Sequence, residues 1–140
     1  MQIAIVNGPN LNLLGKREVD IYGNKSFDAF YEELKAEYPD IKLTYFQSND
    51  EGELITYIQG QGFVVDGIIL NAAGYSHTSI ALADAISAVP APVVEVHISN
   101  IFAREAFREH SFMSAVCVGV ISGFGLHGYR MAISHLVNSK

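Results

Sequence analysis

Charged residues are scarce in this sequence, and basic residues are scarcer than acidic ones. The 140 residues include 9 Lys and Arg against 15 Asp and Glu, which gives a formal net charge of -6. A nucleic-acid partner would need a basic face to neutralise its phosphates. We therefore expect no nucleic-acid partner.

Cysteine is almost absent as well. Cys117 is the only one, so the chain can form no internal disulfide, and it lies in the apolar run 115–118. This position is typical of a small core residue in a protein from a reducing compartment. No apolar window reaches the roughly 20 residues of a membrane helix, and the opening residues lack the basic flank of a signal peptide. We expect a cytoplasmic protein that does not contact a membrane.

Hydrophobic residues are plentiful, at 49% of the chain, and they fall into short runs typical of buried strands. These runs are Ile3–Val6, Leu43–Phe46, Gly67–Leu70, Val93–Val96 and Ala115–Val118. Helical patterns separate them. Three helices are expected to begin at a capping residue: one from Ser26 to Pro39, one from the Asp50–Glu53 capping box through Ile58, and one from Thr78 to about Ala88. Two more are expected over Ala103–Glu109 and Leu126–Val137.

This alternation predicts an α/β fold with a five-stranded parallel sheet and helices on both faces. Five strands joined by crossover helices favour a flavodoxin-like strand order, although periodicity alone leaves that order open. With 140 residues, we expect a single domain covering 1–140.

Polar residues follow the carboxyl ends of three of the expected strands. Asn7 and Asn10 follow the first, Asn71 and His77 follow the third, and the segment 97–100 ends the fourth. Ligands of open parallel sheets bind at this edge. Each residue alone could merely end a strand or cap a helix, but together they favour a pocket for a polar small molecule.

Glu95 and His97 are two residues apart in the fourth strand, so their side chains share one face. A carboxylate beside an imidazole favours the protonated ring and orients it, which suits a general acid. A buried structural pair and a pair of metal ligands are the alternatives. No further set of His, Cys and carboxylate residues completes a metal site, so we expect no metal.

Arg17 and Tyr22 lie together in the long loop after the first strand. A guanidinium near a phenol favours the phenolate, which could act as a base, although an exposed Arg and a loop Tyr are also ordinary. The backbone N–H groups of a turn such as Ile98–Ser99 can bind a carboxylate. Arg104 and Arg108 are four residues apart and share a helix face. One could reach the pocket while the other pairs with a neighbouring glutamate.

The remaining aromatic and imidazole side chains are assigned more simply. Tyr75 stays undecided between the pocket and the core. Packing roles are expected for Tyr31, Tyr38, Tyr45, Tyr57 and Tyr129, and structural or surface roles for His110, His127 and His135.

Taken in chain order, these segments resemble the type II 3-dehydroquinate dehydratases. The resemblance rests on the segments 7–15, 17–18, 22–23, 47–49, 71–79, 95–100, 104–108 and the glycine-rich end 119–129. It spans nearly the whole chain. Val19 departs from it, because many members have proline there; this changes the loop that carries Tyr22 and removes no catalytic group.

The resemblance implies a lyase that converts 3-dehydroquinate to 3-dehydroshikimate through an enolate, by anti elimination and without a cofactor. Tyr22 would be the base that removes a proton alpha to the ketone, and Arg17 would favour its phenolate. Asn10 would help to hold the enolate through a water. His97, partnered by Glu95, would protonate the departing hydroxyl.

The resemblance also implies binding residues and an assembly. Asn71, His77 and Arg108 would bind ring hydroxyls, and Ile98 with Ser99 would bind the carboxylate. Asp84 would reach the site from a neighbouring subunit. Members of the family form trimers grouped into a dodecamer, so a homo-oligomer of this kind is expected.

A flavodoxin-like binding module without catalysis is the second hypothesis. A flavin-phosphate loop rich in Ser and Thr should then follow the first strand, whereas the sequence has Gly8–Leu11. A phosphoacceptor receiver domain needs acidic residues where Asn7 stands. Incubation with 3-dehydroquinate separates the hypotheses, because the enone product absorbs ultraviolet light.

Overall fold

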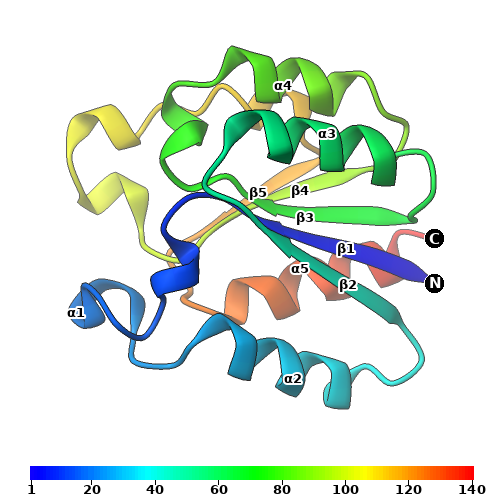
Figure 1. Cartoon of the computed structure of the whole chain (residues 1–140), viewed down its shortest axis with the longest axis horizontal. Coiled ribbons are helices and arrows are strands. Elements are labelled where there is room, and N and C mark those ends of the chain that lie inside the picture. The colour runs from blue at the N-terminus through cyan, green and yellow to red at the C-terminus, as the bar shows by residue number, and fades with distance from the viewer.

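The computed structural model describes residues 1–140 and contains one five-stranded sheet (Figure 1). Its strands are β1 (Gln2–Asn7), β2 (Lys42–Gln47), β3 (Gly67–Asn71), β4 (Val93–His97) and β5 (Gly119–Ser122). Every neighbouring pair is parallel, and the spatial order is β2-β1-β3-β4-β5. This confirms the predicted flavodoxin-like sheet.

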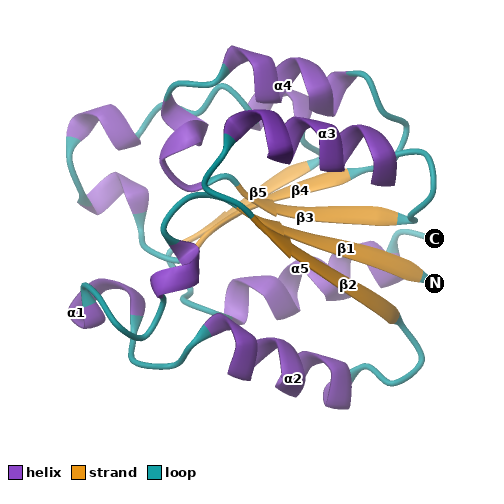
Figure 2. Ribbon diagram, in the orientation of Figure 1, coloured by secondary structure: helices purple, strands orange, loops and turns teal.

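Helices cover both faces of this sheet, as the sequence predicted (Figure 2). They are α1 (Val19–Tyr22), α2 (Phe27–Glu37), α3 (Glu51–Gln61), α4 (Ile80–Ser87) and α5 (His127–Asn138). The helices α3 and α4 lie over one face, and α2 and α5 lie over the other. None of the helices combines the length and the hydrophobicity that crossing a membrane requires.

The sheet separates two apolar cores, and β1 contributes to both because successive strand residues point to opposite faces. Ile3 and Ile5 pack with residues of α2 and α5, while Ala4 and Val6 pack with residues of α3 and α4. All four side chains are completely buried. A strand that is covered on both sides must be apolar on both faces, which explains why the β1 sequence is apolar without alternation.

Two of the predicted helix starts are confirmed by cap hydrogen bonds. The Ser26 hydroxyl accepts from the backbone N–H of Ala29 at 3.2 Å, and the Asp50 carboxylate accepts from that of Glu53 at 3.1 Å. The Glu53 side chain does not complete the capping box, because it accepts from the Ser48 hydroxyl at 2.8 Å instead. These bonds satisfy backbone donors that have no partner inside the helix.

The predicted cap of α4 is wrong by one residue. Ser79, not Thr78, accepts the hydrogen bond from the Leu82 N–H, at 3.0 Å. An N-cap residue needs an extended backbone, which Ser79 has (φ -99°, ψ 101°) and Thr78 lacks (φ -135°, ψ -24°).

The prediction of a strand over Ala115–Val118 is also wrong. Residues Ser114–Val116 form a 3-10 turn, and the edge strand β5 begins at Gly119. The reason is the anchoring of this segment: Met113 is fully buried and the Ser114 hydroxyl bonds to Glu95. Because an edge strand is exposed, its short sequence carries little of the hydrophobic signal that marks the inner strands.

The expected helix Ala103–Glu109 consists of two separate 3-10 turns, Ile101–Ala103 and Ala106–Arg108. Arg104 lies between them with an extended backbone (φ -114°, ψ -159°), which interrupts any helix. The long loop after β1, residues 8–24, contains two short regular elements, the 3-10 turn Leu11–Leu13 and the helix α1, which the sequence did not predict.

We predict that Gly8→Ala lowers the free energy of unfolding by about 1–3 kcal/mol, the usual cost of overpacking. An added Cβ would lie 2.6 Å from the carbonyl oxygen of Ala72, and backbone atoms there cannot yield easily. Gly60→Ala is the matched control. It has open space around the added atom and should stabilise α3 by about 0.5–1 kcal/mol. Urea denaturation of both variants tests this, and equal stabilities would contradict it.

Candidate active site

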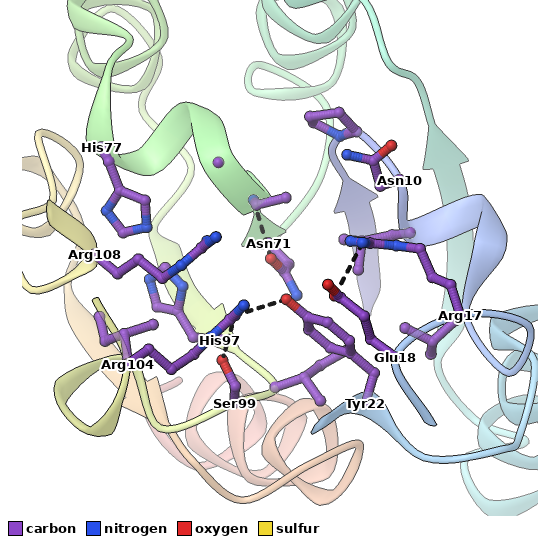
Figure 3. A pocket seen from close by; sticks show the side chains of 17 residues that line it. Asn10, Arg17, Glu18, Tyr22, Asn71, His77, His97, Ser99, Arg104 and Arg108 are labelled. Atoms are coloured by element: carbon purple, nitrogen blue, oxygen red, sulfur yellow. Dashed lines mark hydrogen bonds and ion pairs between the residues drawn. The ribbon is translucent and has the colours of Figure 1, made fainter. Parts of the chain in front are cut away.

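A cavity of about 250 Å³ opens at the carboxyl ends of β1, β3 and β4 (Figure 3). Most of the predicted site residues line it. They are Asn10, Arg17, Tyr22, Asn71, His77, His97, Ile98, Ser99 and Arg108. Arg104 lines it as well; the sequence had left open whether Arg104 or Arg108 would reach the pocket. Glu18 also lines it and was not among the predicted site residues.

Glu95 lies directly behind His97 and is buried beneath the cavity floor. Its Oε2 is hydrogen-bonded to Nε2 of His97, and its Oε1 accepts from the Ser114 hydroxyl at 2.8 Å. Because the carboxylate occupies Nε2, Nδ1 is the ring nitrogen of His97 that remains for a ligand. The predicted pairing of these two residues is therefore present.

The partners of Glu95 favour its ionised form. Burial by itself would raise the pKa of Glu95, but the hydrogen bond and the positive charge of His97, with the hydroxyls of Ser114 and Ser111, lower it below its ordinary value. The ionised carboxylate of Glu95 is the hydrogen-bond partner of His97 Nε2. The pair can thus hold a proton for delivery into the cavity.

Two arginines surround the Tyr22 ring. Arg104 Nη1 donates to the Tyr22 hydroxyl at 2.7 Å and to the Ser99 hydroxyl at 3.2 Å. The guanidinium carbons of Arg17 and Arg104 each lie 5.5 Å from the ring centroid. The predicted Arg17–Tyr22 contact is present, and the hydrogen-bonding partner of the phenol is Arg104.

Glu18 joins the same cluster through an ion pair with Arg17, at 2.9 Å. Its backbone is left-handed (φ 44°), which is uncommon for a residue other than glycine. Nothing in the sequence beyond its position next to Arg17 indicated that Glu18 would line the cavity.

His77 is oriented by a residue that was expected to be structural. Its Nδ1 lies 2.7 Å from the backbone oxygen of His110, so Nδ1 carries the proton and Nε2 is free to accept. The rings of His77 and His97 lie nearly parallel, with centroids 6.2 Å apart. His77 thus offers the cavity an acceptor while it remains neutral.

Asn10 and Tyr75 are both tied to the segment after β2. The Asn10 N–H donates to the Asn49 side chain at 3.0 Å, and the Tyr75 hydroxyl donates to the Asn49 backbone oxygen at 2.8 Å. Asn10 itself has a left-handed backbone (φ 71°). Tyr75, which the sequence left undecided, does not line the cavity and packs against the core.

Of the remaining candidates, Arg108 lines the cavity and Asp84 does not. Arg108 lines the cavity while Glu105 accepts a hydrogen bond from its Nε at 2.6 Å, so both Arg104 and Arg108 reach the site. Asp84 does not line the cavity: its side chain is exposed on α4. No group of three or more His, Cys, Asp or Glu side chains is placed to hold a metal ion, so Glu95 and His97 have no further partner for one.

A carboxylate–imidazole pair and a phenol held by guanidinium groups meet at one cavity, an arrangement suited to general acid–base catalysis. The fold and the site together define an α/β enzyme that acts on a small polar molecule.

Comparison with known proteins identifies the family. The model of the family described as dehydroquinase class II matches residues 1–137. A 3-dehydroquinate dehydratase of Exiguobacterium sp. is 55% identical over 138 residues, which cover 98% of this chain and 94% of that protein. One from Aliarcobacter butzleri is 53% identical over 139 residues, covering 98% and 85%.

A solved structure agrees with these relatives. The crystal structure of the type II dehydroquinase from Butyrivibrio crossotus matches with a TM-score of 0.95 at 43% identity, over 98% of this chain and 97% of that one. The chain therefore belongs to the class II dehydroquinase family, which confirms the resemblance drawn from its motifs.

The lowered pKa of Glu95 predicts an acid-dependent contribution to stability. A carboxyl whose pKa is lower in the folded state contributes stability above its unfolded value of 4.5, and that contribution is lost as the pH falls through the folded value. We expect the difference in unfolding free energy between wild type and Glu95→Gln to be largest above pH 4.5 and to shrink below it.

The control for this measurement is Glu37→Gln. The pKa of Glu37 is also lowered, chiefly by its hydrogen bond with Arg130, but the pair is solvent-exposed and screened. The difference in unfolding free energy between wild type and Glu37→Gln should therefore change much less with pH. A difference for Glu95→Gln that does not change with pH would contradict the assignment of an ionised Glu95.

Proposed function

We propose that this chain, a type II 3-dehydroquinate dehydratase, removes water from 3-dehydroquinate by anti elimination through an enolate, with Tyr22 as base and His97 as acid. The observation that carries the proposal is the hydrogen bond from Arg104 to the Tyr22 hydroxyl, at 2.7 Å. The guanidinium holds the phenol at the cavity and can stabilise negative charge on its oxygen during proton transfer.

The first step is proton removal. The Tyr22 phenolate takes the proton from the carbon alpha to the ketone, and the electron pair of that C–H bond moves to the ketone oxygen. Arg17 and Arg104 flank the ring and can stabilise its negative charge. Asn10, on the cavity wall, would stabilise the enolate oxygen through a water.

The second step is loss of the hydroxyl. The enolate re-forms the ketone, its electron pair makes the new C=C bond, and the C–O bond breaks. His97 donates its proton to the departing oxygen, which leaves as water. Glu95, bonded to Nε2, stabilises the imidazolium until that transfer and holds Nδ1 toward the cavity.

Binding the substrate requires donors and acceptors for its hydroxyls and carboxylate. We assign the hydroxyls to Asn71, at the end of β3, and to His77 and Arg108, which lie in 3-10 turns; all three line the cavity. We assign the carboxylate to Ile98 and Ser99, which follow β4 in the same wall. These assignments use the polar groups of the cavity without requiring a metal or an organic cofactor.

The same proposal extends to the assembly and setting of the enzyme. Residues 1–140 act as one catalytic domain, in the cytoplasm, and associate as trimers that form a dodecamer. The exposed position of Asp84 on α4 supports this, because a carboxylate there is available to the cavity of a second copy.

The activity itself is tested by ultraviolet absorbance during incubation with 3-dehydroquinate. The enone product absorbs and the substrate does not, so absorbance should rise with time and with enzyme concentration. Heat-denatured enzyme is the control. No rise at any pH between about 6 and 9, where a poised acid and base operate, would refute the proposed function.

We predict that Tyr22→Phe lowers kcat by at least about 100-fold, because it removes the base. Arg17→Ala should lower kcat by about tenfold through the lost cation–ring contact. KM should change far less in both variants. Tyr38→Phe, which removes a tyrosine hydroxyl far from the cavity, is the control and should keep wild-type kcat. An unchanged kcat in Tyr22→Phe would remove Tyr22 from the mechanism.

A second prediction concerns Asp84. If a neighbouring copy supplies it, dilution to monomers should abolish activity, and Asp84→Ala should raise KM without changing the assembly. Light scattering read alongside activity over a dilution series measures both. Full specific activity in a verified monomer would rule out a shared site.

A third prediction follows from the lysines. An imine route needs a lysine in the cavity, yet none lines it, and Lys16, the only lysine near a motif, is absent from its walls. Borohydride added with substrate should therefore leave both the activity and the mass of the enzyme unchanged. A covalent adduct on Lys16 in peptide mass spectrometry would overturn the enolate mechanism.

A further inference from the structure

Three buried polar side chains form a hydrogen-bonded row beneath the cavity. Asn7 ends β1 and Asn71 ends β3, and the two residues are directly opposite in the parallel register. Tyr129 of α5 lies against both. Asn71 Nδ2 donates to the Tyr129 hydroxyl at 3.0 Å, and that hydroxyl donates to Asn7 Oδ1 at 2.8 Å.

The direction of these hydrogen bonds is fixed at one end. Asn71 Oδ1 accepts from the backbone N–H of Ala73 at 3.1 Å, so the amide nitrogen of Asn71 must face Tyr129. A hydroxyl that accepts from Asn71 donates its single proton elsewhere, and Asn7 Oδ1 is the acceptor in reach. Asn7 Nδ2 is left buried without a partner. The row therefore has only one consistent arrangement of protons.

One donor of the Asn71 amide remains unused by this arrangement. Its oxygen bonds to Ala73 and one N–H bonds to Tyr129, which leaves a second N–H for the cavity that Asn71 lines. Tyr129 itself is completely buried and does not line the cavity. Burial raises the pKa of its phenol, which therefore keeps its proton.

We propose that Tyr129 is a positioning residue that fixes the Asn71 amide with its N–H toward the cavity. The ligand atom opposite is then an oxygen that accepts, such as a ring hydroxyl lone pair. Without the Tyr129 hydroxyl, the Asn71 amide nitrogen loses its acceptor, and only the bond from the Ala73 N–H to the amide oxygen still holds the group, so its second N–H is directed less firmly toward the cavity. This inference rests on the proposed role of the cavity as the substrate site.

The test is the KM and kcat of Tyr129→Phe, which retains the ring that packs edge-on against Phe27 and Phe30. We expect KM to rise about tenfold, the usual consequence of one misdirected buried hydrogen bond, with kcat within about twofold. Tyr31→Phe is the matched control, since the Tyr31 hydroxyl also donates one hydrogen bond, to the Leu43 oxygen at 2.9 Å, but far from the cavity. Its KM should equal that of wild type.

A double-mutant cycle with Asn71→Ala separates positioning from general loosening of the structure. If Tyr129 acts through Asn71, Tyr129→Phe adds no further rise of KM once Asn71 is alanine. An equal rise in both backgrounds would overturn the inference. So would an unchanged KM in Tyr129→Phe while Asn71→Ala raises KM, and that result would leave the proposed function intact.

Two single variants, Asn71→Ala and Asn7→Ala, test the inference further. If Asn71→Ala leaves KM unchanged, the binding role of Asn71 and this inference both fail, although dehydratase activity in the absorbance assay would still stand. Asn7→Ala leaves the Tyr129 ring untouched but removes the acceptor of its hydroxyl. Asn7→Ala should raise KM, as Tyr129→Phe does. An unchanged KM in Asn7→Ala would also contradict the inference.

Discussion

Arg104 Nη1 lies 2.7 Å from the Tyr22 hydroxyl, and this contact joins the loop after β1 to the segment after β4. The two residues are 82 positions apart in the chain. The same Arg104 nitrogen also bonds to Ser99, so one guanidinium ties the phenol to the strand that carries His97. Tyr22 also packs against the apolar core and lies near Arg17, but Arg104 is the hydrogen-bonding partner of its hydroxyl. This bond holds the proposed base at the cavity that the proposed acid, His97, also lines.

The sheet provides the rigid side of the site. The side chains of Asn7, Asn71, Glu95 and His97 are all buried at its carboxyl edge, where unpaired polar groups are costly. Each of the four side chains makes at least one hydrogen bond to another buried or backbone group. Pairing reduces the cost of burial and at the same time restricts rotation. The fixed half of the site thus lies on strands, and the half that carries Tyr22 lies on a loop.

Much of this could be predicted from the sequence, because the inner strands are uniformly apolar and the polar residues follow their ends. The edge strand β5 could not, since Val118 and Val120 are exposed and the preceding apolar run is anchored elsewhere. For Arg104 the sequence left open whether it or Arg108 would reach the pocket, whereas its extended backbone between two turns directs it to Tyr22. Tyr129 was assigned to packing because it lies in a helical pattern; its hydroxyl partners, Asn7 and Asn71, are 122 and 58 positions away. Local patterns do not report such distant pairs.

The central claim is that proton removal depends on the Arg104–Tyr22 contact. The most direct measurement is the deuterium isotope effect on kcat, with 3-dehydroquinate deuterated at the carbon that loses its proton, in wild type and in Arg104→Lys. Lysine keeps the charge but loses the planar guanidinium that reaches both Tyr22 and Ser99. We predict a lower kcat and a larger isotope effect in Arg104→Lys, because proton removal becomes slower relative to the other steps. The same kcat and the same isotope effect in both enzymes would contradict the account.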